Sequence, residues 1–185
     1  LLDTYLAGEK EREAAFQAVY QCVCGGGSID TAIEEALSRR TFTPEAAAFV
    51  RELASGAVTG VVELDSRYAP FLKSGWTPER LALIDRLVLR IAVYELWSVP
   101  SVPPKVTIDC AIELAKRFGG ADSAPFINAV LGKVLEASPK RDWKEGSGGS
   151  ESARSNETLA EPERARTNPN EPEQEAAWTV KSEEE

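Results

Sequence analysis

Apolar residues recur at spacings of three and four along most of the first 138 residues, which is the spacing that places them on one face of an α-helix. The first of these stripes lies in residues 9–23 and consists of Ala15, Phe16, Val19, Cys22 and Val23. Further stripes lie in residues 29–37, 49–68, 81–97, 108–118 and 126–135. No segment shows sustained alternation of apolar and polar residues. The pattern predicts an all-α fold, a compact bundle of about six or seven helices.

Several of these helices carry start signals. After the break at "GGGS", Ser28 or Asp30 can cap the second helix. Thr43 can cap the third, because Pro44 after it suits the first helical position. The same Thr-Pro-Glu order returns at residues 77–79, so we expect a further helix to begin there.

Two glycines lie one turn apart in the third helix, at Gly56 and Gly60. Glycine costs about 1 kcal/mol relative to alanine inside a helix. A pair at this spacing therefore predicts that another helix approaches closely at this point.

The segment 81–97 is apolar on nearly all sides, which predicts a helix in the middle of the bundle. Its charged residues are Asp85, Arg86, Arg90 and Glu95. Arg86 and Arg90 share one face because they are four residues apart. We expect the two arginines to pair with Asp85, Glu95 or other acids of the bundle.

Charge and composition change near residue 139. Residues 1–138 contain 14 Lys and Arg against 18 Asp and Glu, a net charge of −4. Residues 139–185 contain seven against twelve, a net charge of −5, and they are rich in Gly, Ser, Pro, Asn and Glu. Such a segment buries too little apolar surface to offset the entropy of ordering. We therefore expect one folded domain, 1–139, followed by a disordered acidic tail, 140–185.

The side chains available for chemistry are few. The chain has no histidine, which removes the commonest general base and most zinc sites. Its three cysteines, Cys22, Cys24 and Cys110, suit neither a disulfide framework nor a four-ligand metal site. No run of 18 apolar residues is present to span a membrane. We expect a cytoplasmic protein with reduced thiols, no metal, no cofactor and no membrane contact.

The stretch "AKRFGGADSAPFINAVLGKV", residues 115–134, reads as a helix end, a tight turn and a second helix start. Asp122 and Ser123 can cap the second helix. Phe118 and Phe126 flank the turn, and each can be ordinary core. Bases of single-stranded RNA also stack on aromatic rings while their phosphates contact basic side chains, and Lys116 and Arg117 are adjacent.

Three stretches together resemble the NusB family of transcription antitermination factors: "EREAAFQAVYQ", "LIDRLVLRIAVYEL" and "VPPKVTIDCAIELAKRFGGADSAPFINAVLGKV". The resemblance implies an all-helical domain built from two small halves, and a protein that is not an enzyme. It implies pairing with NusE, a small-subunit ribosomal protein. It further implies binding of box A single-stranded RNA in ribosomal RNA leader transcripts, within the RNA polymerase antitermination complex.

The resemblance also implies site residues. The family has an arginine-rich segment at the start of its first helix, whereas "AGEKEREAAFQ" offers only two basic residues among three glutamates. The implied RNA-binding residues are Lys10, Arg12, Lys116, Phe118, Asp122, Ser123 and Phe126. The implied NusE-binding residues are Tyr20 and Asp85.

Two alternatives stay open. NusB-like domains also precede the catalytic domain of rRNA cytosine-5 methyltransferases, but here "INAVLGKV" runs into an acidic segment instead of a nucleotide-binding domain. A protein–protein module with weakened RNA binding is the other, and the acidic first helix favours it. Because the domain is acidic, we expect the lone chain to bind RNA weakly and a basic partner to supply charge.

Overall fold

The computed structural model describes residues 8–144. These residues form seven α-helices and two short 3₁₀ helices and no β-strand, which confirms the all-α prediction. The elements are α2 (Glu9–Gly25), α3 (Ile29–Ser38), α4 (Pro44–Thr59), α5 (Val61–Tyr68), η1 (Ala69–Phe71), η2 (Pro78–Arg80), α6 (Leu83–Ser98), α7 (Pro104–Phe118) and α8 (Ser123–Ala137).

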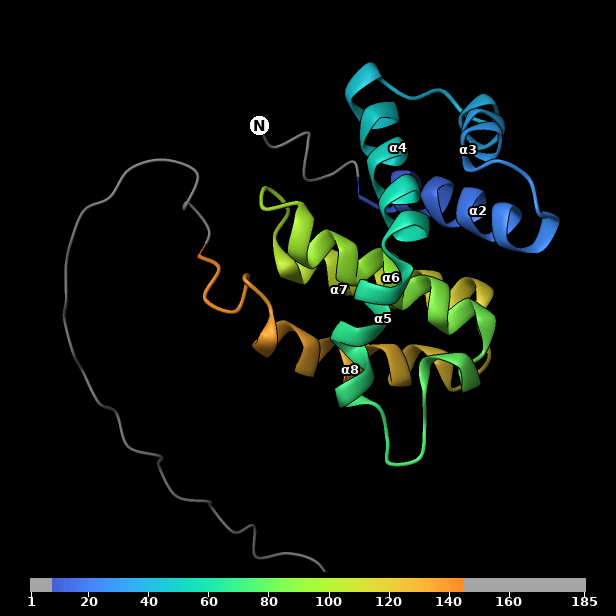
Figure 1. Ribbon diagram of the computed structural model, residues 1–185. Coiled ribbons are helices and arrows are strands. Elements are labelled where there is room, and N and C mark those ends of the chain that lie inside the picture. The colour runs from blue at the N-terminus through green and yellow to red at the C-terminus, as the bar shows by residue number, and fades with distance from the viewer. Residues whose placement is uncertain (1–7, 145–185) are drawn as a thin grey trace, which may run out of the picture. The chain divides into compact units, whose positions relative to one another are not determined.

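The helices group into two halves, as expected. Helices α2, α3 and α4 pack against one another in the first half. Helices α5, α7 and α8 pack around α6 in the second (Figure 1). The halves meet where α6 contacts α2 and α4 and where α7 contacts α2.

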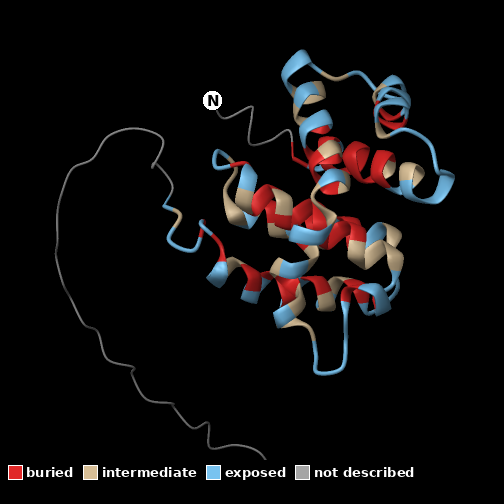
Figure 2. Ribbon diagram, viewed as in Figure 1, coloured by how far each residue is buried: buried red, intermediate tan, exposed pale blue. Residues whose placement is uncertain are grey.

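Helix α6 is the centre of the bundle, as its all-round apolar sequence predicts. From Leu87 to Val93 every residue is buried, and Leu96 is fully enclosed. Figure 2 shows the buried residues on the sides of the helices that face their neighbours. Burial of each such Leu or Val side chain stabilises the fold by about 1.5–3 kcal/mol.

The predicted caps of the first half are confirmed. The Ser28 side chain, rather than that of Asp30, caps α3 by accepting a hydrogen bond from the Asp30 amide at 3.2 Å. The Thr43 side chain caps α4 by accepting from the Ala46 amide at 3.2 Å, with Pro44 at the first helical position. Each cap satisfies an amide that would otherwise lack an intrahelical partner.

The start predicted at residues 77–79 is wrong. Pro78–Arg80 forms only a 3₁₀ turn, and the Thr77 side chain makes no capping bond. The backbone is extended at Leu81 and Ala82, with ψ angles of 150° and 140°, and α6 begins at Leu83. Leu81 is buried by this break, so tertiary packing of one side chain overrides the local start signal.

The glycine pair does mark a close approach. A Cβ atom at Gly56 would lie 2.2 Å from the ring of Tyr94 on α6, so only glycine fits there. Gly60 acts differently, because it ends α4 and begins α5. The long helix expected over this stretch is therefore two helices.

A buried ion pair joins the two halves. Arg12 of α2 donates to Glu95 of α6 through Nε at 2.8 Å and Nη2 at 2.6 Å. Thr107 of α7 donates to the same carboxylate at 2.5 Å, and Arg12 also donates to the Gly8 carbonyl at 2.6 Å. Arg12 and Glu95 are 4% and 0% exposed. Both charges are thus removed from water and are compensated by each other and by neutral partners.

Of the two arginines on α6 that were expected to pair with acids, Arg90 does so, whereas Arg86 Nε is buried and has no hydrogen-bond partner among the described residues. Arg90 donates to both carboxylate oxygens of Asp65 on α5, at 2.8 and 2.6 Å. Tyr68 donates its hydroxyl hydrogen to the same carboxylate at 2.8 Å. Burial is the main cause that raises the pKa of Tyr68, so its hydroxyl remains a donor. Arg90 therefore meets an acid of the bundle, as expected, although the acid is neither Asp85 nor Glu95.

The folded part extends past the boundary predicted at 139. Lys140 is 4% exposed, and its Nζ donates to the Val102 carbonyl at 2.7 Å. Burial lowers the pKa of Lys140 to about 8. Lys140 therefore packs on the folded domain, and residues 145–185 of the predicted tail lie outside the described residues. Among residues 8–144, no helix is both long and apolar enough to cross a membrane.

We expect Glu95→Leu to lower the free energy of unfolding by about 3–5 kcal/mol, because it leaves the Arg12 guanidinium buried without a counter-charge. Urea denaturation measures the change. The exposed pair of Arg51 and Glu34 is the control, and Glu34→Leu should cost no more than about 1 kcal/mol. A similar small cost for both variants would contradict a role of the buried pair in joining the halves.

Candidate nucleic-acid interface

The turn between α7 and α8 is held by Ser123 and not by Asp122. Ser123 Oγ accepts a hydrogen bond from the Gly120 amide at 2.9 Å, and Ser123 is 6% exposed. A Cβ atom at Gly119 would lie 2.5 Å from that oxygen, so the turn requires glycine there. Asp122 stands at the cap position but makes no capping bond, and it is exposed. Its carboxylate faces solvent, where a ligand can reach it.

The aromatic residues of this turn are partly core. Phe118 stacks on Phe16 of α2, with ring centroids 4.8 Å apart. Phe126 packs against the hydrophobic core, and both Phe118 and Phe126 are half-buried. Lys116 is 57% exposed and pairs with Glu113 at 2.6 Å. Both rings thus combine a packing contact with an exposed part.

The two basic residues at the start of α2 have different surroundings. Lys10 is exposed and belongs to the surface. Arg12 points inward to Glu95, and its guanidinium also lies over the Phe49 ring at 5.1 Å. We therefore assign Arg12 to the core and leave it out of the candidate RNA surface, which corrects the expectation from the resemblance.

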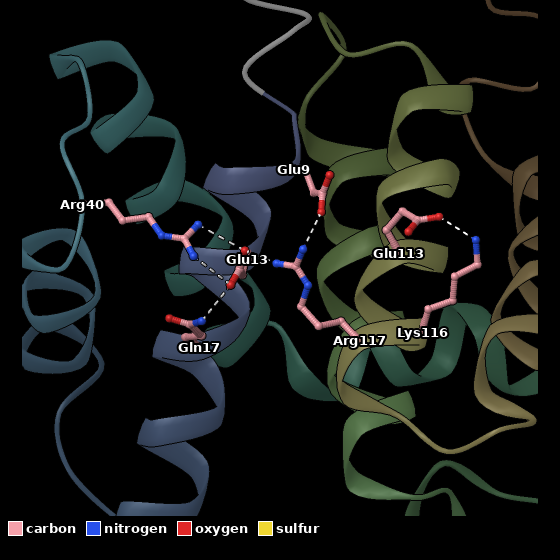
Figure 3. Close-up of polar contacts among 7 residues, drawn as sticks. All are labelled: Glu9, Glu13, Gln17, Arg40, Glu113, Lys116 and Arg117. Atoms are coloured by element: carbon pink, nitrogen blue, oxygen red, sulfur yellow. Dashed lines mark hydrogen bonds and ion pairs between the residues drawn. The ribbon is translucent and has the colours of Figure 1, made fainter.

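Glu13 organises the surface between α2 and α7, and we call it and its three partners Gln17, Arg40 and Arg117 the Glu13 hub (Figure 3). Gln17 donates to Glu13 Oε1 at 3.1 Å. Arg40 donates to both carboxylate oxygens at 3.2 Å each. Arg117 donates to Oε2 at 2.5 Å and reaches Glu9 at 3.0 Å. The four bonds to Glu13 match the number of acceptor sites that a carboxylate offers.

The hub brings together segments far apart in sequence. Arg117 and Glu13 are 104 residues apart, and Arg40 and Glu13 are 27 apart. The start of α2 and the last turn of α7, both implied by the resemblance as RNA-binding segments, therefore lie side by side (Figure 3).

A row of aromatic side chains continues from Phe118 along α2. Phe16 stacks on Tyr20 with centroids 6.2 Å apart, so the rings of Phe118, Phe16 and Tyr20 are in sequence. The row borders an open hollow of about 390 Å³. Its lining residues are Phe16, Gln17, Tyr20, Gln21, Arg39, Ile84 and Phe118.

The residues implied to bind NusE lie close to this hollow. Tyr20 is 41% exposed, and a hydrogen bond with the neighbouring Cys24 thiol raises the pKa of Tyr20. Asp85 follows Ile84, a lining residue of the hollow. Within the described residues, Asp85 Oδ1 is buried and has no hydrogen-bond partner. Asp85 as a residue is half-buried, and this oxygen itself is enclosed by the chain and not open to another molecule.

Three contributors to this surface were not identified from the sequence. Arg40 and Glu13 carry no local signal, because each acts through partners on another element. Phe16 belongs to the apolar stripe of its helix, which does not reveal its stacking on Phe118. The neighbouring basic pair Lys116 and Arg117 was the available signal for the α7 side.

The chain was compared with known proteins. Residues 9–136 match the NusB family. A transcription antitermination protein NusB from Halalkalibacterium halodurans is 45% identical over 131 residues, which cover 71% of this chain and 95% of that protein. One from Symbiobacterium thermophilum is 40% identical over 138 residues, or 70% of this chain and 90% of that protein. The solved structure of T. maritima NusB is 32% identical, with a TM-score of 0.67 over 73% of this chain and 95% of that one.

We expect Gly119→Ala to lower the free energy of unfolding by about 1–3 kcal/mol, because the added Cβ clashes with Ser123 Oγ and with the Ala115 carbonyl, 2.6 Å away. The matched control is Gly120→Ala, whose Cβ would lie 3.9 Å from Ser123 Oγ. Its effect should stay within about 0.5 kcal/mol. Equal melting temperatures for the two variants would contradict this account of the turn.

Proposed function

The chain belongs to the NusB family, and on this premise we propose that it pairs with NusE and that the pair binds box A-type single-stranded RNA of ribosomal RNA leader transcripts. It is a transcription antitermination factor of this family. The pair acts in the cytoplasm, within the RNA polymerase antitermination complex.

The observation that carries the RNA-binding proposal is the juxtaposition made by the Glu13 hub. Lys10 of α2 and Lys116 of α7 are exposed, and the bond from Arg117 to Glu13 joins these two helices. Phe118 and Phe126 offer ring surface beside it, and bases of single-stranded RNA stack on such rings. Asp122, with its exposed carboxylate, and Ser123, which is buried and holds the turn, complete the proposed RNA site.

The observation that supports pairing with NusE is the hollow beside Tyr20 and Asp85. Tyr20 offers an exposed ring and a hydroxyl donor, and the half-buried Asp85 adds a negative charge in the first turn of α6. The negative charge of Asp85 would attract a basic partner docked there. The partner would also supply positive charge that residues 1–138, at net −4, lack.

A protein–protein module with weakened RNA binding is the second candidate. Glu9, Glu13 and Glu113 each pair with a basic residue of the surface and reduce its net charge. The enzyme alternative has no comparable support, because the relatives compared above are named as antitermination proteins.

We expect the lone chain to bind box A RNA weakly and with a shallow salt dependence, and its complex with NusE to bind more tightly with a steeper one. On single strands the slope of log K against log salt is about −0.7 for each phosphate contact. Fluorescence titration of labelled RNA at several salt concentrations measures both slopes, with a scrambled RNA as the specificity control. No RNA binding by the complex, beside intact NusE pairing, would favour the second candidate.

The same titration separates the two roles of Phe126. Phe126→Ala should weaken RNA binding by about 1–3 kcal/mol if a base stacks on the exposed part of the ring. A purely structural role would instead lower the free energy of unfolding by about 3–5 kcal/mol. Normal RNA binding by a folded but destabilised variant would remove Phe126 from the RNA site.

We expect Asp85→Lys to weaken NusE binding by about tenfold, because it reverses a negative charge that would attract a basic partner. Calorimetry with purified NusE measures the affinity. The control is Glu52→Lys, the same charge reversal at an exposed position of α4, which should leave the affinity unchanged. Asp85 has no place in the interface if both variants bind NusE like the wild type.

A further inference from the structure

We infer that Arg40 and Arg117 contact phosphates of the bound RNA and that Glu13 is the positioning residue that holds both arginines for this task. The inference rests on the RNA-binding function proposed above. It adds Arg40, from the turn after α3, to that surface. It also assigns the acidic Glu13 a role that favours RNA binding.

The distribution of exposure within the hub is the first argument. The Glu13 side chain is 8% exposed, whereas those of Arg40 and Arg117 are 47% and 49% exposed. The negative charge therefore lies beneath two positive charges. The hub has two positive charges and one negative charge, and a ligand that arrives from solvent meets the guanidinium groups before Glu13. Glu9, which pairs with Arg117, is 52% exposed.

Unused hydrogen-bond donors are the second argument. A guanidinium has five N–H donors in a planar fork that matches the oxygens of a phosphate. Arg40 spends two bonds on Glu13, and Arg117 spends one on Glu13 and one on Glu9. Within the described residues, each arginine thus has about three N–H donors that make no hydrogen bond and can bind a ligand.

Preorganisation is the third argument. An arginine that binds a phosphate from a freely rotating state loses side-chain entropy, about 0.5–1.5 kcal/mol for each immobilised side chain. Glu13 already orders both arginines, Arg117 from α7 and Arg40 from the turn after α3. In the view of Figure 3, Arg40, Arg117 and Lys116 follow one another across α2 and α7. Such a row suits the repeated charges of an RNA backbone.

The test compares the salt dependence of RNA binding by the complex with NusE for wild type, Arg40→Gln and Arg117→Gln. Each variant should reduce the slope by about 0.7. Between 50 and 200 mM salt its loss of affinity should be about 2.6-fold smaller than that of the wild type. The effect should be equal on box A and scrambled RNA, because phosphate contacts carry no sequence information.

The control is Arg51→Gln, which removes an arginine of the same exposure, 47%, that also pairs with a glutamate. Its slope should equal that of the wild type. Unchanged slopes for both hub variants, in a wild-type complex that does bind RNA, would overturn the inference and leave the proposed function intact. No binding by the wild-type complex would remove the proposed function itself and the inference with it.

Glu13→Gln tests the positioning role separately. The substitution removes a negative charge, so a purely electrostatic effect would tighten RNA binding. If Glu13 positions the arginines, the variant should instead bind more weakly, by about threefold to tenfold, as two preorganised contacts loosen. A melt in parallel establishes that the variant is folded. Tighter binding would show that Glu13 competes with RNA for the arginines, which overturns its positioning role.

Discussion

The buried contact between Arg12 and Glu95 sets the geometry on which the surface of this domain depends. It fixes α2 against α6, and Thr107 ties α7 to the same carboxylate. Successive residues of an α-helix point about 100° apart around its axis. Once Arg12 is held in the core, the direction of the next residue, Glu13, is fixed toward α7. A buried pair of charges thereby determines where an exposed set of charges is built.

Local signals predicted the helices well where local chemistry decides the outcome. Ser28 and Thr43 cap their helices because an amide at a helix start needs an acceptor close by in sequence. The local signals failed at residues 77–79, where the burial of Leu81 overrides the same Thr-Pro-Glu order. The break at Gly60 was also missed, because a glycine that allows close packing and a glycine that ends a helix look alike in sequence.

The candidate site was predictable only in part, for a related physical reason. One short stretch, 116–123, contains four of the candidate residues, so a sequence motif includes them all: Lys116, Phe118, Asp122 and Ser123. Arg12 shows the limit of this reasoning, because the basicity of a residue does not tell whether its partner is an RNA phosphate or a buried glutamate. Glu13 shows the converse. From the sequence, an acidic residue such as Glu13 argues against RNA binding. In the structure, Glu13 instead accepts hydrogen bonds from two arginines that belong to other segments.

The long separation within the Glu13 hub has a consequence for how the domain matures on the ribosome. Glu13 and Arg117 are 104 residues apart, and a bacterial-type synthesis rate of about 5–20 residues per second separates their emergence by roughly 5–20 s. Helices α2, α3 and α4 pack against one another and emerge first. Until α6 and α7 follow, Arg12 lacks Glu95, and Glu13 lacks Arg117. The nascent first half thus presents Arg12 without its counter-charge and Glu13 without one of its arginines, and the completed surface exists only after most of the domain has been synthesised.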